Sequence, residues 1–203
     1  MRFFVSESLK FFFLITPFFF LITPFFALSM FLALLPDAGE DERRRVANRT
    51  VVAAWVISVS MFLFGQVIFN VLGISVDAFR IGAGALLFLS AVSLMNPKVS
   101  TAGHDDGNDI AVVPLAMPVV IGPATCGPLL VKGAEVCDWS GRLTMIAAMT
   151  ISLLALWIIL RVGATIERHL GKKGIAILMR LTGLVLSALS AQMIMTGVRS
   201  FLV

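Results

Sequence analysis

The residues of this sequence best suited to chemistry are prolines and glycines that shape the backbone of one apolar stretch, residues 110–131. They are Pro114, Pro118, Gly122, Pro123, Gly127 and Pro128. An interior proline removes a backbone N–H and clashes with the preceding turn, so the stretch predicts a discontinuous helix. Its second half would begin near Gly122–Cys126 with free N–H groups, which suit an anionic group such as a carboxylate.

A second proline-containing stretch lies near the N-terminus, where the heptapeptide Phe-Phe-Phe-Leu-Ile-Thr-Pro occurs in tandem at Phe11–Pro17 and Phe18–Pro24. A broken helix and a continuous, proline-kinked helix both fit this pattern. Two broken stretches would together predict a binding site where their ends meet. The candidate site residues are Thr23, Pro24, Pro118, Gly122, Pro123, Ala124 and Thr125.

Other kinds of chemistry lack the residues that they need. The histidines His104 and His169 have no partners at metal-ligand spacing. There is neither a Walker-type glycine motif nor a nucleophile with a matching base. We therefore expect no enzyme activity, no metal and no cofactor. Cys126 and Cys137 leave a thiol relay as an alternative, although the first half of the chain has no cysteine to face them.

Composition indicates what surrounds these stretches. Of the 203 residues, 59% are hydrophobic and only 14% are charged, against about 25% charged in a typical soluble domain. One water-soluble domain of this length cannot bury so much apolar side chain, whereas a bilayer can accommodate it. The net charge of +4 is small and scattered, which excludes a nucleic-acid partner and favours membrane lipid.

Runs of about 20 apolar residues predict an all-α integral membrane protein, with spans one and four broken by proline. The six predicted spans are Phe11–Leu35, Thr50–Leu72, Phe79–Met95, Ile110–Val131, Leu143–Leu160 and Gly174–Val198. The first run exceeds the core of a cleaved signal peptide, which has about 7–15 residues, so we expect it to be a span. No Asp or Glu lies inside any predicted span. Arg80 and Arg180, near span ends, are expected to reach the membrane interfaces.

The distribution of basic residues predicts the orientation in the membrane. Of 16 Lys and Arg, ten lie in or beside the loops after spans one, three and five: Arg43, Arg44, Arg45, Arg49, Lys98, Arg161, Arg168, Lys172, Lys173 and Arg180. The positive-inside rule places these loops in the cytoplasm and both termini outside it. Because the loops are short, residues 1–203 are expected to form a single membrane domain.

The two halves of the chain resemble each other weakly. Arg80, Leu86, Leu89, Ser90 and Ala91 each have an identical residue 100 positions later, and Pro24 aligns with Pro123 at an offset of 99. Repeat one covers about residues 8–96 and repeat two about 109–199, with a connecting loop at 96–109. Since three spans are an odd number, the repeats would have inverted topology, as in many secondary transporters. Chance matching of leucine-rich helices is the alternative.

Two long motifs resemble those of the MarC family of membrane proteins. One runs from Ala78 to Leu89, and the other runs from Asp109 to Pro118 and continues as Ile121-Gly122-Pro123. The basic segment Glu42-Arg43-Arg44-Arg45 falls where such proteins have a basic first loop, so the resemblance covers essentially the whole chain. It implies a six-span protein of the bacterial inner membrane, in the lysine-exporter superfamily. The family is classed with transporters of small neutral amino acids.

The chain departs from the family pattern in spans one and four. The usual Asn-Pro-x-Gly-x-x-Pro is replaced by Thr23-Pro24-Phe25-Phe26-Ala27-Leu28-Ser29, and Ala124 stands where the family has glycine. The leading expectation is a secondary transporter or exporter of a small solute, with a small neutral amino acid as the implied substrate, bound between spans one and four. A different substrate follows if the altered positions contact it. The alternative is a non-transporting membrane scaffold or regulator, and a homo-oligomer is compatible with either expectation.

Overall fold

The computed structural model describes residues 15–35, 38–95, 120–136 and 138–202. Throughout this part the chain is helical, without strands. A helical segment at residues 15–21 precedes the main helices. These are α2 (Pro24–Leu34), α3 (Glu40–Leu72), α4 (Val76–Met95), α5 (Pro123–Glu135), α6 (Trp139–Arg161) and α7 (Gly163–Leu202).

Five segments of the described chain have the length and hydropathy to cross a bilayer. They are Ile15–Leu34, Glu40–Leu72, Val76–Met95, Trp139–Arg161 and Lys173–Leu202. They correspond to the predicted spans one, two, three, five and six, which confirms an all-α membrane protein. Only the second half of predicted span four, as α5, lies within the described residues. Residues 110–119 and the loop 96–109 lie outside them.

Two helices extend beyond their predicted bounds into charged sequence. α3 begins at Glu40 rather than Thr50, so the basic segment after span one is helical and not a loop. Three acidic residues in its first turn favour that start, because they face the positive end of the helix dipole. α7 begins at Gly163, and Gly171, with φ 65° and ψ 172°, separates its first turns from the span that follows.

Span one is interrupted at Thr23, as the prolines predicted. Thr23 has φ 46° and ψ 60°, a left-handed conformation that is unusual for a β-branched residue. Pro24 follows as the first residue of α2, where its missing N–H costs no helical hydrogen bond. The Thr23 N–H still bonds the Phe20 carbonyl at 3.0 Å, and the Ala27 N–H bonds the Thr23 carbonyl at 3.0 Å. The break is therefore one left-handed residue flanked by backbone hydrogen bonds, and not an open loop.

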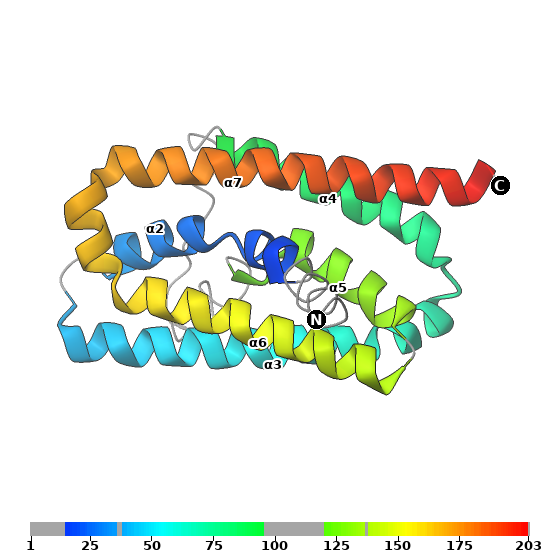
Figure 1. The fold of residues 1–203 in the computed structure, drawn as a ribbon, viewed down its shortest axis with the longest axis horizontal. Helices are drawn as coiled ribbons and strands as arrows, with labels where there is room; N and C mark the ends of the chain where they lie inside the picture. The colour runs from blue at the N-terminus through cyan, green and yellow to red at the C-terminus, as the bar shows by residue number, and fades with distance from the viewer. Residues whose placement is uncertain (1–14, 36–37, 96–119, 137, 203) are drawn as a thin grey trace, which may run out of the picture.

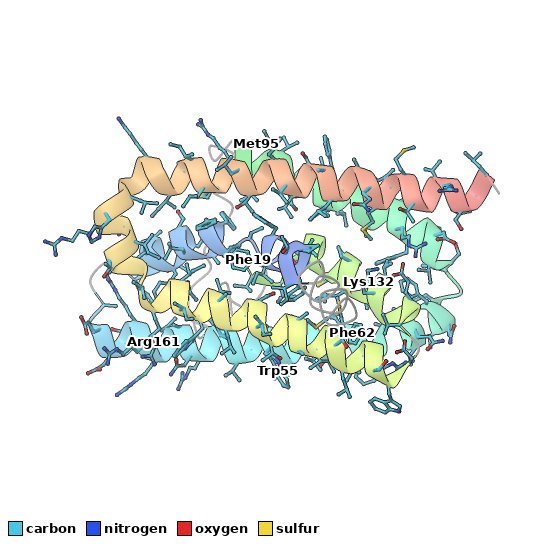
Figure 2. All side chains as sticks on the ribbon, in the orientation of Figure 1. Phe19, Trp55, Phe62, Met95, Lys132 and Arg161 are labelled. Carbon is cyan, nitrogen blue, oxygen red and sulfur yellow. The ribbon has the colours of Figure 1, made fainter. Side chains whose placement is uncertain are left out.

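The helices form three layers, with the broken spans in the middle (Figure 1). α4 lies along α7 on one side, while α3 and α6 lie together on the other. Between these layers α2 contacts α6 and α7, and α5 contacts α3 and α4. Large apolar side chains cover the outer surface, including Leu72, Leu89 and Leu184, which are 60%, 64% and 58% exposed (Figure 2). An apolar exterior of this kind suits lipid contact.

Glycines let the layers approach closely, as is common between membrane helices. A Cβ at Gly133 of α5 would lie 2.0 Å from the Phe62 carbonyl oxygen of α3, and one at Gly65 would lie 2.5 Å from the Leu130 carbonyl oxygen. Two polar contacts also join α3 to α6. The Trp157 indole N–H donates to Asn48 Oδ1 at 2.7 Å, and the Trp55 indole N–H donates to Thr150 Oγ1 at 3.0 Å.

Candidate functional site

The two proline-containing spans meet at their breaks. α5 begins at Pro123 with Gly122 as its N-cap, in extended conformation. In the first turn of α5, the Thr125 hydroxyl donates to the Leu21 carbonyl at 2.9 Å, at the end of the segment 15–21. The helical partner of that carbonyl would be the Phe25 N–H, but the left-handed Thr23 interrupts the helix between the two residues. Thr125 is 3% exposed and Leu21 is half-buried, so the hydroxyl gives this carbonyl a partner inside the protein.

The predicted site residues gather around this contact. Thr23 is the left-handed residue at the break, and Pro24 begins α2. Gly122 caps α5, and Pro123 and Ala124 are the first two residues of that helix. Pro118 lies outside the described residues. The neighbouring Val120 and Ile121 are fully buried. The structure thus brings six of the seven predicted positions to the crossing of the two broken spans, but the Thr125 hydroxyl is engaged by the backbone.

A cavity of about 340 Å³ lies beside this crossing. It is partly open and is lined by the segment 15–21 and by residues of α4, α5, α6 and α7. Its apolar lining comprises Pro17, Phe18, Leu21, Leu87, Pro128, Leu129, Val131, Met145, Leu189 and Met193. Its polar lining comprises Arg80, Lys132, Glu135, Gln192 and Thr196. The cavity is therefore lined by spans one and four, but by none of the six described candidate site residues.

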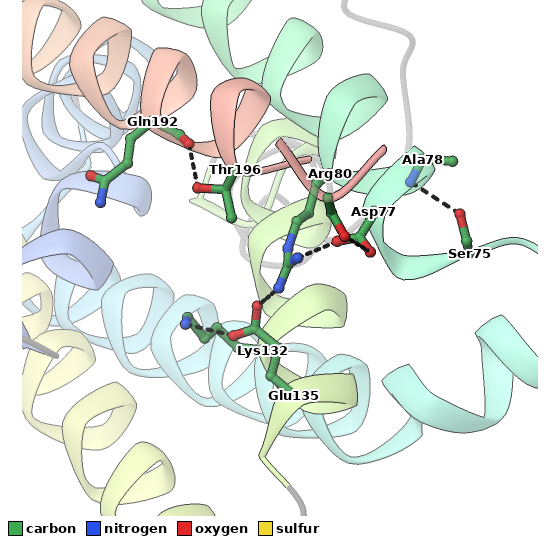
Figure 3. A network of polar contacts seen from close by, with 9 residues as sticks. Ser75, Asp77, Ala78, Arg80, Lys132, Glu135, Gln192 and Thr196 are labelled. Carbon is green, nitrogen blue, oxygen red and sulfur yellow. Dashed lines mark hydrogen bonds and ion pairs between the residues drawn. The ribbon is translucent and has the colours of Figure 1, made fainter. Parts of the chain in front are cut away.

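The charged residues of the cavity form one network (Figure 3). Arg80 of α4 pairs with Asp77 in its own helix and with Glu135 at the end of α5. Lys132 Nζ lies 2.7 Å from the second carboxylate oxygen of Glu135. The Ser200 hydroxyl of α7 donates to Asp77 Oδ2 at 2.6 Å. Two helices, α4 and α5, thus contribute opposite charges to one cluster at one end of the molecule, and α7 adds a hydroxyl donor.

Arg80 is held in ion pairs, which its place near the end of a predicted span did not indicate. Its side chain is 17% exposed and held by two carboxylates. Arg180, its match in the second half, is exposed on α7. Sequence reasoning overlooked the cluster because Asp77 and Glu135 lie just outside the apolar runs, whereas α4 and α5 extend far enough to include both. The partners Arg80 and Glu135 are 55 residues apart, so their spacing carries no signal.

A second, open apolar pocket lies between α4 and α5 and is lined by Cys126, Gly127, Ala83 and Phe79 among others. A Cβ at Gly127 would lie 2.4 Å from that of Ala83, so the two helices touch there. Cys126 is half-buried and makes no disulfide. Cys137 lies outside the described residues. A thiol relay therefore gains no support from the described part of the chain.

The chain was compared with known proteins. It matches the model of the MarC family of integral membrane proteins over residues 9–202. It is 33% identical to the UPF0056 membrane protein MJ1677 of Methanocaldococcus jannaschii, over 87% of this chain and 89% of that protein. It is 29% identical to the UPF0056 inner membrane protein YhgN of Escherichia coli K12, over 86% of this chain and 89% of that protein. No solved structure matches it. The family match spans both broken stretches and the charged cluster between them, and this chain is a member of the MarC family of integral membrane proteins.

Proposed function

We propose that the protein is a secondary transporter of a small solute, which binds in the cavity between the segment 15–21 and α5. The observation that carries this proposal is the charged cluster of Arg80, Lys132 and Glu135 on a mostly apolar cavity. Arg80 lies within the candidate span Val76–Met95, and an ionisable residue within a membrane helix is costly and usually marks a pathway or a binding site. Here the cluster lies next to two broken helices, which is where transporters of this general kind bind their substrates.

The size and charge of the cavity favour a small zwitterion. Its volume of about 340 Å³ lies at the lower end of the range of ligand pockets, about 300–1,000 Å³. Arg80 and Lys132 can receive a carboxylate, and the side-chain oxygen of Gln192 can accept from an ammonium group. The apolar lining leaves room for a short side chain only. A small neutral amino acid, the substrate class implied by the family, meets these requirements.

The packing supports an inverted repeat in which α4 and α7 are equivalent. A Cβ at Gly84 would lie 3.2 Å from the Ser190 carbonyl oxygen, and one at Gly183 would lie 2.9 Å from the Ala91 carbonyl oxygen. The two contacts are equivalent at an offset of 99 residues, because Gly84 then corresponds to Gly183 and Ala91 to Ser190. The same offset relates Pro24 to Pro123. The other helix contacts follow the same relation, in which α2, α3 and α4 correspond to α5, α6 and α7. The contact of α3 with α5 then corresponds to that of α6 with α2, and the contact of α4 with α5 to that of α7 with α2. The sequence match at an offset of 100 is then one residue out of register.

The distribution of charge supports the predicted orientation. The end of the molecule with the α3 N-terminus and the α6 C-terminus carries basic residues, among them Arg44, Arg45 and Arg161. The opposite end carries fewer basic residues in the described chain, namely Arg80, Lys132, Arg142 and Arg199. The positive-inside rule then assigns the basic end to the cytoplasm and both termini to the outside. We propose the bacterial inner membrane as the location, by analogy with YhgN, with lipid as the partner of the apolar exterior.

Uptake into liposomes tests the transport function. The purified protein would be reconstituted in Escherichia coli polar lipid, and uptake of radiolabelled glycine, alanine and serine measured with and without proton or sodium gradients. Gln192→Trp would fill the cavity from α7. Met195→Trp is the matched control, because Met195 lies on the same helix, is 64% exposed and does not line the cavity.

Saturable uptake that Gln192→Trp abolishes and Met195→Trp preserves is the expected result. Equal uptake by both variants would exclude this cavity as the binding site. Flat traces for folded wild-type protein on the whole panel would contradict transport of small neutral amino acids. That outcome would favour the alternative of a membrane scaffold or regulator.

A further inference from the structure

Arg80 is held in a position from which it can bind a second anion. Its guanidinium lines the cavity and is 17% exposed. In the described part of the chain its partners are Asp77 through one terminal nitrogen and Glu135 through the other. A guanidinium carries more N–H donors than these two contacts engage, and its planar fork matches a carboxylate. Gln192 and Thr196 line the same cavity from α7.

The contacts of Arg80 differ in how firmly they are anchored. Asp77 is one turn before Arg80 in α4, and its other oxygen accepts the Ser200 hydroxyl at 2.6 Å. This carboxylate therefore fixes the guanidinium on the α4 and α7 side. Glu135 is the last residue of α5, and its other oxygen lies 2.7 Å from Lys132 Nζ. The pair between Arg80 and Glu135 is the contact that joins α4 to α5 across the end of the cavity.

Lys132 lowers the cost of separating Arg80 from Glu135. If Glu135 leaves Arg80, it keeps a cation in Lys132, and Arg80 keeps an anion in Asp77. No charge is then left without a partner, which would otherwise be expensive in a membrane protein. A carboxylate that enters the cavity can take the vacated donors of Arg80. The carboxylate of a solute can thus replace the Glu135 carboxylate at the Arg80 guanidinium.

We propose that Arg80 binds the carboxylate of the transported solute, and that Glu135 is an internal competitor that occupies Arg80 while the cavity is empty. This inference rests on the proposed transport function. It assigns the specificity to Arg80 and requires the solute to carry a carboxylate. It also gives the two residues opposite effects, because loss of Arg80 removes the anchor and loss of Glu135 removes the competitor.

The test compares alanine with alaninamide, which lacks the carboxylate, in liposomes of Escherichia coli polar lipid. In the wild type, unlabelled alanine should inhibit uptake of labelled alanine, and alaninamide should not. Arg80→Gln should raise the KM for alanine by about 10-fold to 100-fold, the loss of a hydrogen bond to a charged group. Arg80→Lys should restore part of the affinity. Arg180→Gln is the matched control, since Arg180 is exposed on α7 and away from the cavity.

Glu135→Gln separates this role from a merely structural one, because a damaged fold cannot lower KM. We expect the KM for alanine to fall several-fold in this variant. Saturable alanine uptake with an unchanged KM in Arg80→Gln would overturn the inference and leave the transport function standing. A raised KM in both Arg80→Gln and Glu135→Gln would also overturn it, since the pair would then be structural. Absence of alanine uptake in folded wild-type protein would overturn the inference together with transport of this amino acid.

Discussion

The contact between α3 and α5 makes a sharp prediction about Gly133. A Cβ there would lie 2.0 Å from the Phe62 carbonyl oxygen and 2.9 Å from its carbonyl carbon. Both are backbone atoms, so no side chain can rotate away to make room. A carbon normally approaches such an oxygen no closer than about 3.3 Å. Gly133→Ala must therefore move the two helices apart by about 1 Å. This shift also disturbs the reciprocal close contact of Gly65, at which an added Cβ would lie 2.5 Å from the Leu130 carbonyl oxygen.

The expected cost follows from two opposing effects. Overpacking of a tight contact costs about 1–3 kcal/mol, and the upper end applies because backbone atoms clash. Alanine is favoured over glycine inside a helix by about 1 kcal/mol. The net destabilisation by Gly133→Ala is therefore about 2 kcal/mol. Gly82→Ala, on α4, has nothing within 4 Å of the added Cβ, so only the helix-propensity gain remains and this variant should be stabilised by up to about 1 kcal/mol.

Reversible unfolding by increasing SDS in mixed micelles, followed by tryptophan fluorescence, measures both variants. The protein has three tryptophans to report on it. The transition should shift to lower SDS for Gly133→Ala and to the same or higher SDS for Gly82→Ala. Shifts of equal sign and size in the two variants would refute the close packing of α3 on α5.

Three further predictions concern the breaks and the caps. Thr125→Val removes the hydrogen bond to the half-buried Leu21 carbonyl and should cost about 1 kcal/mol. Thr144→Val, whose hydroxyl bonds only the preceding turn of its own helix, should cost little, and equal losses in SDS unfolding would contradict the bridge between the two broken spans. Thr23→Gly relieves a left-handed conformation that costs about 1–2 kcal/mol, so this variant should be at least as stable as the wild type, and a clear loss would count against the left-handed residue at φ 46°. The Ser140 hydroxyl and the Gly141 N–H lower the pKa of Asp138. The stabilisation by the Asp138 carboxylate is present above the ordinary carboxyl pKa of 3.8 and is lost as the pH falls through the lower pKa of the folded state. Asp138→Asn should therefore weaken the pH dependence of the thermal unfolding midpoint in that acidic range. An unchanged pH dependence would exclude this cap as its cause.

The membrane spans could be predicted because hydropathy alone identifies them. Five of the six apolar runs reappear as helices long enough to cross a bilayer. The start of α3 at Glu40 and the first turns of α7 could not be found in this way, since both are charged and helical. An apolar run ends where the lipid ends, whereas a helix ends where its caps and backbone hydrogen bonds end. Hydropathy therefore locates spans better than it locates helix ends.

The break in span one and the start of α5 were predictable because proline acts locally. Pro24 and Pro123 each begin a helix at the position that the missing N–H allows. The charged cluster was not predictable, because it depends on which helices become neighbours. Arg80 and Glu135 meet only after α4 packs on α5 through Ala83 and Gly127. Local rules thus identified the crossing of the broken spans, while the chemistry beside it required the tertiary structure.

The proposed two-fold relation also bears on why the cavity is charged at one end only. At the offset of 99 that the glycine contacts favour, the equivalent of Arg80 is Met179, which is 8% exposed in the apolar core. The equivalent of Lys132 is Ala33, so neither cation has a charged counterpart in the other repeat. The close packing at glycines would then be common to both repeats, whereas the charges of Arg80 and Lys132 occur in one half of the pseudo-symmetric structure only. A solute anchored by Arg80 would then be bound near the end of the molecule that carries Asp77 and Glu135.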